Sequence, residues 1–491
     1  MDKIYFNNVN IVVMQVKWVQ IENFRAIEKL DWKPQSELVC IIGAGDTGKS
    51  SLLDAIEVVL SPKKNQFFDT DFINGDVSKK ICITITIGEL SSALFDENKF
   101  GLFLRGWGSN QIHDEPLEED EIVVTVRLTV EGNLLPVWEL ITDRSVPKTL
   151  SQRDRNAFGL VRLDDENESF AWGKYSQLAS LSEDDTEATA ALIEIYRQSK
   201  GLIKNSLIEN FIAAAKKVRS AAIEMGAYSK HEFSPGLDVQ ALSTNLKNLS
   251  LHGENIPIRL AGLGTRRLTA LAIQRLSIPD GAIVIADEIE SGLEPHRIRH
   301  ILNVLRKQTT KLGDEPVGQV LITTHSSVAV EELNAEELVI TSYSNNELKL
   351  LTPEKELQPL IRKNSQALLS KSILVCEGRT EIGLLRSLRN WWSSRNNDEP
   401  MEFRGVVFSD GSGSSAPNTA LRLAKLGYKV ALFRDSDKKL SEMEIQSLLD
   451  NKINVYQWDD SLSTEQIIFK EISETAIQRM LNLAIVDKSE G

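Results

Sequence analysis

The chain has 491 residues, of which 42% are hydrophobic and 26% are charged, and its net charge is −14. This composition is typical of a water-soluble globular protein, and at roughly 150 residues a domain the length predicts about three domains. The acidic balance argues against nonspecific wrapping of nucleic acid by a basic surface. It leaves room for a DNA enzyme with a local basic groove.

The sequence contains no sign of membrane insertion or export. No stretch approaches the roughly 18 consecutive apolar residues of a membrane helix, and Asp2 lies where a signal peptide would be apolar. Cys40, Cys82 and Cys376 lie in strand-like runs and fit reduced thiols better than a disulfide framework. We therefore expect a cytoplasmic protein with no membrane partner.

In chain order, the pattern predicts two α/β units. Strands are expected at 16–21, 38–42, 81–87, 122–130, 282–285 and 320–323, with a helix at 51–60. Residues 186–225 have helical spacing and divide at Gly201 into two expected helices. Residues 352–371 are polar and mixed, which predicts a linker. The second unit then has expected strands at 372–376, 405–408 and 430–433, and an expected helix at 381–392.

Residues 43–50 match the phosphate-binding pattern G-x-x-x-x-G-K-[ST] between an expected strand and an expected helix. Backbone N–H groups of such a loop converge on phosphate oxygens at the positive end of the helix dipole. We expect Lys49 to pair with the β- and γ-phosphates of ATP and Ser50 to ligate Mg²⁺. The expected ATP-binding residues of this loop are Gly43, Gly45, Asp46, Thr47, Gly48, Lys49, Ser50 and Ser51.

Two later strands end in polar residues that would complete this site. Residues 282–286 form an apolar run that ends in Asp287 and Glu288. We expect Asp287 to hold the Mg²⁺ ion through water and Glu288 to orient or activate the attacking water. His325 follows the strand at 320–323, which places it near the γ-phosphate as a candidate catalytic residue. A structural role for a lone histidine is the alternative.

A second glycine-opened helix is expected at Gly262 and Gly264, before the helical run 268–276. The phosphates of this chain's own ATP are already assigned to residues 43–50. An anion-binding helix start here would therefore serve the ATP of a neighbouring subunit, which predicts a homodimer or a higher homo-oligomer with Gly262 and Gly264 at the nucleotide. An ordinary glycine turn is the alternative.

This order of parts resembles the ABC-type ATPases of DNA maintenance. The likeness includes Ile21-x-Asn23-Phe24-Arg25, the Asp-Glu pair followed by Ser291-Gly292-Leu293, and Thr324-His325-Ser326. Residue 46 is Asp, where that family usually carries Asn.

A second group of carboxylates is expected beyond residue 371. Glu377 follows the strand 372–376, and Asp435 and Asp437 follow the strand 430–433 on one side of the chain. If these strands are neighbours in a parallel sheet, the three carboxylates converge and need cations to neutralise them. Oxygen ligands of this kind suit Mg²⁺ or Mn²⁺, and two such ions are a standard device for phosphodiester cleavage. A solvated turn is the alternative for each piece alone.

Together these pieces resemble the Toprim fold of topoisomerases, primases and OLD (overcoming lysogenization defect) nucleases, and an ABC ATPase followed by Toprim is the OLD architecture. By this resemblance, 410–413 matches the glycine-bearing Toprim loop, and Glu465 is a further metal ligand or only a helix-start glutamate. The family's lysine beyond D-x-D has no clear counterpart before Gly491. The resemblance also implies a dimer contact in an ATPase insertion, for which the helical stretch 186–225 is the candidate.

The resulting prediction is an α/β protein with an ABC-type ATPase domain at 1–351, including an insertion at about 140–250, a linker at 352–371 and a Toprim domain at 372–491 that is incomplete if the lysine is required. The expected function is an ATP-regulated, Mg²⁺- or Mn²⁺-dependent DNA endonuclease that acts in anti-phage defence with a partner protein, RNA or DNA. The alternative is an ATP-dependent DNA clamp or sensor whose Toprim domain is a non-cleaving docking module. A topoisomerase or primase is the third possibility, but no catalytic-tyrosine module or zinc-binding cysteine set supports it.

Overall fold

The computed structural model describes most of the chain. The described residues are 14–45, 47–63, 66–90, 94, 100–163, 170, 178, 209–225, 232–237, 249–254, 256–276, 282–309, 318–344, 346–395, 399–459 and 461–489. Among them, no helix combines the length and the apolar character that crossing a lipid bilayer requires.

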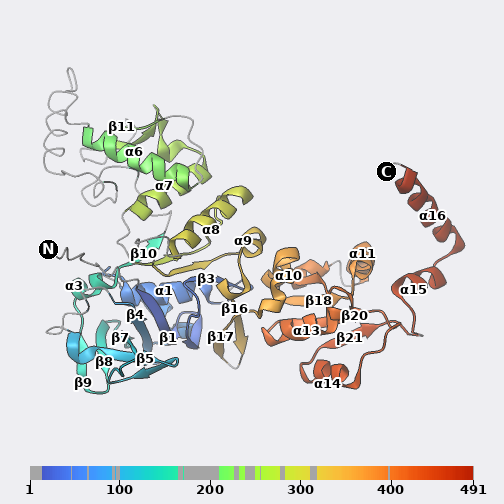
Figure 1. The fold of residues 1–491 in the computed structure, drawn as a ribbon, viewed down its shortest axis with the longest axis horizontal. Coiled ribbons are helices and arrows are strands. Elements are labelled where there is room, and N and C mark those ends of the chain that lie inside the picture. The colour runs from blue at the N-terminus through green and yellow to red at the C-terminus, as the bar shows by residue number, and fades with distance from the viewer. Residues whose placement is uncertain are drawn as a thin grey trace, which may run out of the picture.

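The centre of the first unit is a parallel sheet in the order β10-β14-β15-β3-β16 (Figure 1). Every residue of β3, β14 and β15 is buried, as expected for parallel strands covered on both faces. Helix α1 follows β3 through a glycine loop. The bounds are β10 (Leu160–Leu163), β14 (Ile283–Ala286), β15 (Val320–Thr323), β3 (Leu38–Ile42), β16 (Leu338–Ser344) and α1 (Lys49–Leu60).

The sheet continues beyond β16 through mainly antiparallel strands, in the order β17-β2-β1-β4-β7-β5-β6, while β8 pairs with β7 and β9. The alternating Ile residues of β4 pack into a second core on the α1 side. The bounds are β17 (Glu347–Leu351), β2 (Ile27–Trp32), β1 (Gln15–Phe24), β4 (Ile81–Gly88), β7 (Glu121–Val130), β5 (Arg105–Gly108), β6 (Gln111–His113), β8 (Pro136–Thr142) and β9 (Ser145–Thr149).

The expected insertion at about 140–250 does not begin at residue 140, because β8, β9 and β10 all belong to the main sheet. After β10, the described residues form a lobe in which α6 packs on α7 and β11 (Figure 1). The first expected helix of 186–225 and Gly201 lie outside the described residues. The bounds here are α3 (Gln152–Arg155), α6 (Glu209–Glu224), β11 (Phe233–Leu237), β12 (Leu249–Gly253), β13 (Ile256–Pro257), α7 (Leu263–Leu276) and α8 (Pro295–Thr309).

The segment 352–371 is helical and packed, not an open linker. It contains η11 (Lys355–Leu357), α10 (Gln358–Lys363) and η12 (Ser365–Leu369), and it packs on α9 (Ser327–Glu332). Its apolar side chains, which include Leu357, Ile361 and Leu368, are buried in one hydrophobic core that joins the parallel strands of the first sheet to the second unit. The sequence pattern did not predict this packing, because the segment has few apolar residues and they are separated by polar ones.

The second unit has four parallel strands in the order β19-β18-β20-β21. Strand β18 is central. The chain passes from β18 to β19 on one side of it and then crosses to β20 on the other side. The bounds are β18 (Ser372–Cys376), α11 (Arg379–Ser387), α12 (Arg389–Arg395), β19 (Val406–Asp410), α13 (Ala416–Lys425), β20 (Lys429–Arg434), α14 (Glu442–Asp450), β21 (Asn454–Gln457), α15 (Thr464–Glu471) and α16 (Glu474–Ser489).

Candidate functional site

The loop between β3 and α1 has glycine where its backbone requires glycine. Gly43 has a φ of +151°, and a Cβ there would lie 2.0 Å from Thr341 Oγ1 on β16. Gly48, directly before α1, has a φ of +84°, a left-handed conformation that glycine adopts without strain. A Cβ at Gly45 would meet no atom within 4 Å, so that glycine leaves open space over the loop.

Lys49 lies folded over the same loop. Its Nζ donates to the carbonyl oxygens of Gly43 (3.2 Å) and Ala44 (2.9 Å), and the residue is only 5% exposed. Thr47 Oγ1 donates to Ala44 O at 2.9 Å, which fixes the turn. The ammonium is thus held at the helix start, where it can exchange carbonyl oxygens for phosphate oxygens. Ser50 is exposed and Ser51 half-buried at the same helix start, and Asp46 lies outside the described residues.

Asp287 and Glu288 follow β14 beside this loop, and Thr323 at the end of β15 holds both. Thr323 Oγ1 donates to Asp287 Oδ1 and accepts from the backbone N–H of Glu288 at 2.8 Å. Glu288 has a positive φ of 45°, and its carbonyl accepts from Arg267 Nη2 at 2.8 Å. The backbone of Glu288 is therefore tied from two elements, while its exposed side chain touches Ser291 Oγ at 3.2 Å.

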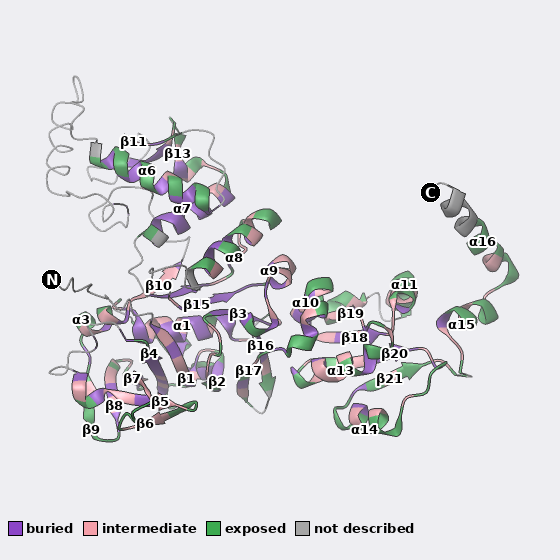
Figure 2. Cartoon of the chain, viewed as in Figure 1, coloured by how far each residue is buried: buried purple, intermediate pink, exposed green. Residues whose placement is uncertain are grey.

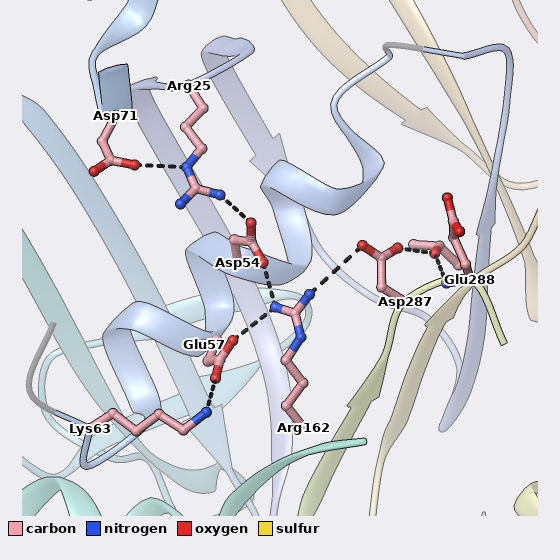
Figure 3. Close-up of polar contacts among 9 residues, drawn as sticks. Arg25, Asp54, Glu57, Lys63, Asp71, Arg162, Asp287 and Glu288 are labelled. Carbon is pink, nitrogen blue, oxygen red and sulfur yellow. Dashed lines mark hydrogen bonds and ion pairs between the residues drawn. The ribbon is translucent and has the colours of Figure 1, made fainter. Parts of the chain in front are cut away.

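A chain of ion pairs joins Asp287 to helix α1 (Figure 3). Arg162 on β10 pairs with Asp54 and, at 2.8 Å, with Glu57, and its Nη2 lies 3.8 Å from Asp287 Oδ2. The Arg162 side chain is 17% exposed. Asp54 also pairs with Arg25, which in turn bonds Asp71 at 2.9 Å. One guanidinium therefore faces three carboxylates, and it links the phosphate-loop helix to the strand end that carries Asp287.

The outer end of this chain is Lys63, whose Nζ lies 2.8 Å from Glu57 Oε1. Burial by itself would raise the pKa of Glu57, but the hydrogen bond and charge of Lys63 and the charge of Arg162 outweigh it and lower that pKa. A lowered carboxyl pKa means that the pairing stabilises the fold above the ordinary pKa of 4.5 and that this contribution is lost as the pH falls below it.

Replacing Arg162 with methionine should lower the free energy of unfolding by roughly 3 kcal/mol at neutral pH, because it removes the guanidinium that three partly buried carboxylates share. Among the described residues, Asp54 and Glu57 then keep only Arg25 and Lys63, respectively, as cationic partners. Denaturant unfolding measures this change. Lys63→Met is the matched control, since its exposed pair contributes less than about 1 kcal/mol. The destabilisation by Arg162→Met should shrink at acid pH as Glu57 becomes protonated. Equal effects of the two substitutions would contradict a central role for Arg162.

His325 lies between β15 and α9 with an exposed side chain. Glu290 positions the backbone there, because its carboxylate accepts from the His325 N–H and from Thr324 Oγ1, both at 2.6 Å. This arrangement fixes the backbone of the Thr-His-Ser segment and leaves the imidazole accessible from solvent.

The two glycines at the start of α7 differ in their surroundings. Helix α7 begins at Leu263, five residues before the expected helical run, so Gly264 lies in its first turn. A Cβ at Gly264 would come within 2.5 Å of Arg297 Nη1 and 3.0 Å of the Gly292 carbonyl oxygen. Gly262 is exposed, and a Cβ there would meet nothing within 4 Å. Gly264 thus serves packing within the chain, while Gly262 faces open space.

In the second unit, Glu377 and Asp435 lie at the carboxyl ends of the adjacent parallel strands β18 and β20, where the direction of the chain connections reverses. This is the place at which open α/β sheets bind ligands. The Asp435 N–H donates to Glu377 Oε2 at 3.0 Å. Burial raises the pKa of Glu377 against the Asp435 N–H and the Arg434 charge, and the charges of Asp435 and Asp437 raise it further.

Helix α15 reaches the same edge. Asp435 Oδ1 accepts from the Thr464 N–H (2.9 Å) and Oγ1 (2.6 Å), and Glu465 Oε1 accepts from Thr380 Oγ1 at 2.9 Å. The loop 410–413 closes over β18, since Gly411 N and Gly413 N each donate at 2.7 Å to the carbonyls of Cys376 and Glu377. A Cβ at Gly411 would lie 2.4 Å from Ala416 Cβ, so this position requires glycine.

The predicted carboxylates therefore lie near one edge, but they do not form a ready metal cage. Among the described residues, no group of three or more His, Cys, Asp or Glu side chains is placed to hold a metal ion. Arg434 Nε lies 3.7 Å from Glu377 Oε2 and supplies the local positive charge, while Asp437 is exposed. The oxygen donors are of the kind that a divalent cation prefers, but a cation would have to draw together side chains that are apart in this structure.

The sequence pattern missed four residues that organise these sites. Arg162, Thr323 and Glu290 hold the strand ends of the first site, and Arg434 pairs with Glu377 in the second. Thr323 and Arg434 carried one weak signal, because each is the polar last residue of an apolar strand, but this position does not reveal their partners.

The fold and the loop geometry define the class of the first unit: it is a P-loop ATPase. Two family matches agree. Residues 14–124 match the family described as "AAA ATPase domain", and residues 138–331 match the family described as "AAA domain, putative AbiEii toxin, Type IV TA system". The prediction of a P-loop ATPase domain is thereby confirmed.

Solved structures with a detectable likeness include heads of SMC proteins. The Smc head domain of Pyrococcus furiosus, solved with an extended coiled coil bound to the C-terminal domain of ScpA, is 14% identical with a TM-score of 0.43 and covers 70% of this chain and 97% of its own. The SMC head domain of Thermotoga maritima is 13% identical with a TM-score of 0.35 and covers 69% of this chain and 99% of its own.

Proposed function

We propose that the protein is an ATP-hydrolysing, Mg²⁺- or Mn²⁺-dependent DNA endonuclease of the OLD type, and that the second unit is its Toprim domain. The observation that carries this proposal is that Glu377 and Asp435 lie in hydrogen-bond contact at the ends of adjacent parallel strands, in a unit joined to a P-loop ATPase. Glu465 lies on the helix α15 that reaches the same sheet edge. Glu377, Asp435 and Asp437 would hold the metal, with Glu465 as a further ligand. The ion would stabilise charge on the scissile phosphate.

In the ATPase, Ser50 and Asp287 would hold the Mg²⁺ ion of ATP. Glu288 has the accessible carboxylate that activation of a water requires, and its backbone is fixed by Thr323 and Arg267. His325 lies on the neighbouring strand end and would contact the γ-phosphate. An effector role in defence against phage follows from the OLD resemblance, and the toxin named in one matched family description is compatible with it.

The experiment that tests the nuclease proposal is incubation of the purified chain with plasmid DNA and Mg²⁺ or Mn²⁺, with and without ATP. Nicked or linear DNA that disappears with a chelator supports the proposal. Intact DNA under all conditions favours the alternative, in which the second unit is a non-cleaving docking module of an ATP-dependent DNA clamp.

Two ATPase units facing each other would place Gly262 against the partner's nucleotide. Gly262→Leu adds a side chain to open space in the single chain, so it should leave ATP binding unchanged and reduce hydrolysis by blocking the partner. Turnover measured against protein concentration checks this, with Asn303→Leu at an exposed position of α8 as the control. Gly264 is unsuitable for this test because its substitution would clash with Arg297 of the same chain. Hydrolysis by Gly262→Leu at the parent rate would argue for a self-contained monomer.

A further inference from the structure

A pocket of about 780 Å³ with mixed polar and apolar lining lies beside the second-unit site, a size typical of small-ligand sites. It is enclosed by α10, α11, the end of β19 and the start of α13. Three cationic side chains line it, Lys363 from α10 and Arg379 and Arg386 from α11. The pocket thus lies between the segment that joins the two units and the helix that begins two residues after Glu377.

The positive charge of this pocket is available to a ligand. Neither Lys363 nor Arg386 has a side-chain partner among the described residues. The carboxylates at the rim are already engaged: Glu356 pairs with Arg422 at 2.9 Å, and Asp410 accepts from the Ser412 N–H at 2.8 Å and lies 3.9 Å from Arg379 Nε. In a chain with a net charge of −14, two cations without a paired carboxylate in the described part of the chain, Lys363 and Arg386, favour an anion in this pocket.

Exposed aromatic rings lie on α12, the helix that follows α11 and contacts it, and on the segment that packs on α12. Trp391 on α12 is 53% exposed, and Phe403 in η13 (Met401–Arg404), which packs on α12, is 74% exposed. The guanidinium of Arg395 lies 4.8 Å from the Trp391 ring centroid. Figure 2 shows exposed residues along the neighbouring α11. We call Lys363, Arg379, Arg386, Trp391 and Phe403 the α11 surface.

Cations that follow a groove and aromatic rings open to solvent are the two elements that bind single-stranded nucleic acid, through phosphates and stacked bases respectively. We propose that the α11 surface binds a nucleic-acid strand with unpaired bases, with its phosphates in the pocket and a base on Trp391. This rests on the proposed function and names its substrate as an unpaired strand. Arg379, two residues from Glu377, would then lead a phosphate toward the carboxylate edge.

The test is the fluorescence anisotropy of a dye-labelled oligothymidylate with the full chain, in EDTA and without ATP. These conditions separate binding from the nuclease proposal, because a failure to cleave DNA leaves the binding measurement intact. The double substitution Lys363→Glu/Arg386→Glu should weaken binding by more than roughly tenfold and make it less dependent on salt. Trp391→Ala should weaken it by roughly tenfold, as expected for loss of one stacked base.

Gly383→Leu provides an uncharged variant, since Gly383 lines the pocket and a Cβ there meets no atom within 4 Å. It should narrow the pocket and weaken binding without disturbing the fold. Lys429→Glu reverses an exposed charge at the opposite end of the sheet, the start of β20, and should bind like the parent. The proposal is overturned if the double variant binds like the parent, if a duplex binds as tightly as the single strand, or if thymidine monophosphate competes as well as the oligonucleotide.

Discussion

Glu288→Gln should bind ATP as the parent does and hydrolyse it about 10²- to 10⁴-fold more slowly, the usual contribution of a positioned general base. The amide is isosteric, and the contacts that fix this residue involve its backbone, so the local structure should survive. Single-turnover hydrolysis and a nucleotide-binding titration measure the two effects. The exposed Glu336→Gln is the matched control.

Unlike Glu288→Gln, Lys49→Ala should abolish ATP binding, because it removes the ammonium group that the loop carbonyls hold at the start of α1. The contrast between these two variants separates the binding role from the catalytic one. A Glu288→Gln protein that turns over ATP at the parent rate would disprove the role assigned to Glu288.

If Asp437 is a metal ligand as proposed, Asp437→Ala should reduce metal-dependent DNA cleavage by about 10²- to 10³-fold, because the loss of that ligand forfeits several kcal/mol of charge stabilisation. Asp437 is exposed, so its removal has little structural cost. Cleavage of supercoiled plasmid in Mn²⁺ measures the effect, and ATP hydrolysis should stay within the range of the parent.

Asp435 needs a different substitution, because its carboxylate also accepts two hydrogen bonds from Thr464. Asp435→Asn keeps an oxygen acceptor for that helix start and removes the charge, so it should lose cleavage while α15 stays in place. The exposed Asp450→Asn is the control. If neither Asp437→Ala nor Asp435→Asn lowers cleavage, the activity belongs to another site.

The sequence predicted those parts of the fold that local pattern determines. The buried strands β3, β14, β15 and β18 and the glycine loop before α1 follow from short apolar runs that end in glycine or polar residues. The carboxyl ends of parallel strands share one edge, so the nearness of Glu377 to Asp435 also followed once β18 and β20 were neighbours.

Contacts between segments far apart in the sequence could not be predicted from the sequence pattern. Arg162 is 108 residues from Asp54 and 125 from Asp287 in the numbering, and no periodicity marks it as their partner. The helices of 355–369 were missed for a related reason. Their few apolar residues have meaning only when α9 and β19 supply the surfaces that cover them. Arg434 ends a strand, and its position in the sequence did not reveal that its guanidinium lies beside Glu377.

The core that runs through Leu357, Ile361 and Leu368 makes the two units a single thermodynamic system. Each unit contributes apolar surface to this core, and that surface is shielded from water only while the other unit is folded. Exposing it to water costs roughly 25 cal/mol for each Å². Partial opening of one unit should therefore lower the stability of the other, so we expect the unfolding of the two units to be coupled. Truncating the chain at either end of residues 352–371 would expose an apolar surface, which favours aggregation. We therefore expect the ATPase unit and the second unit to depend on each other for folding, rather than to fold as two independent domains.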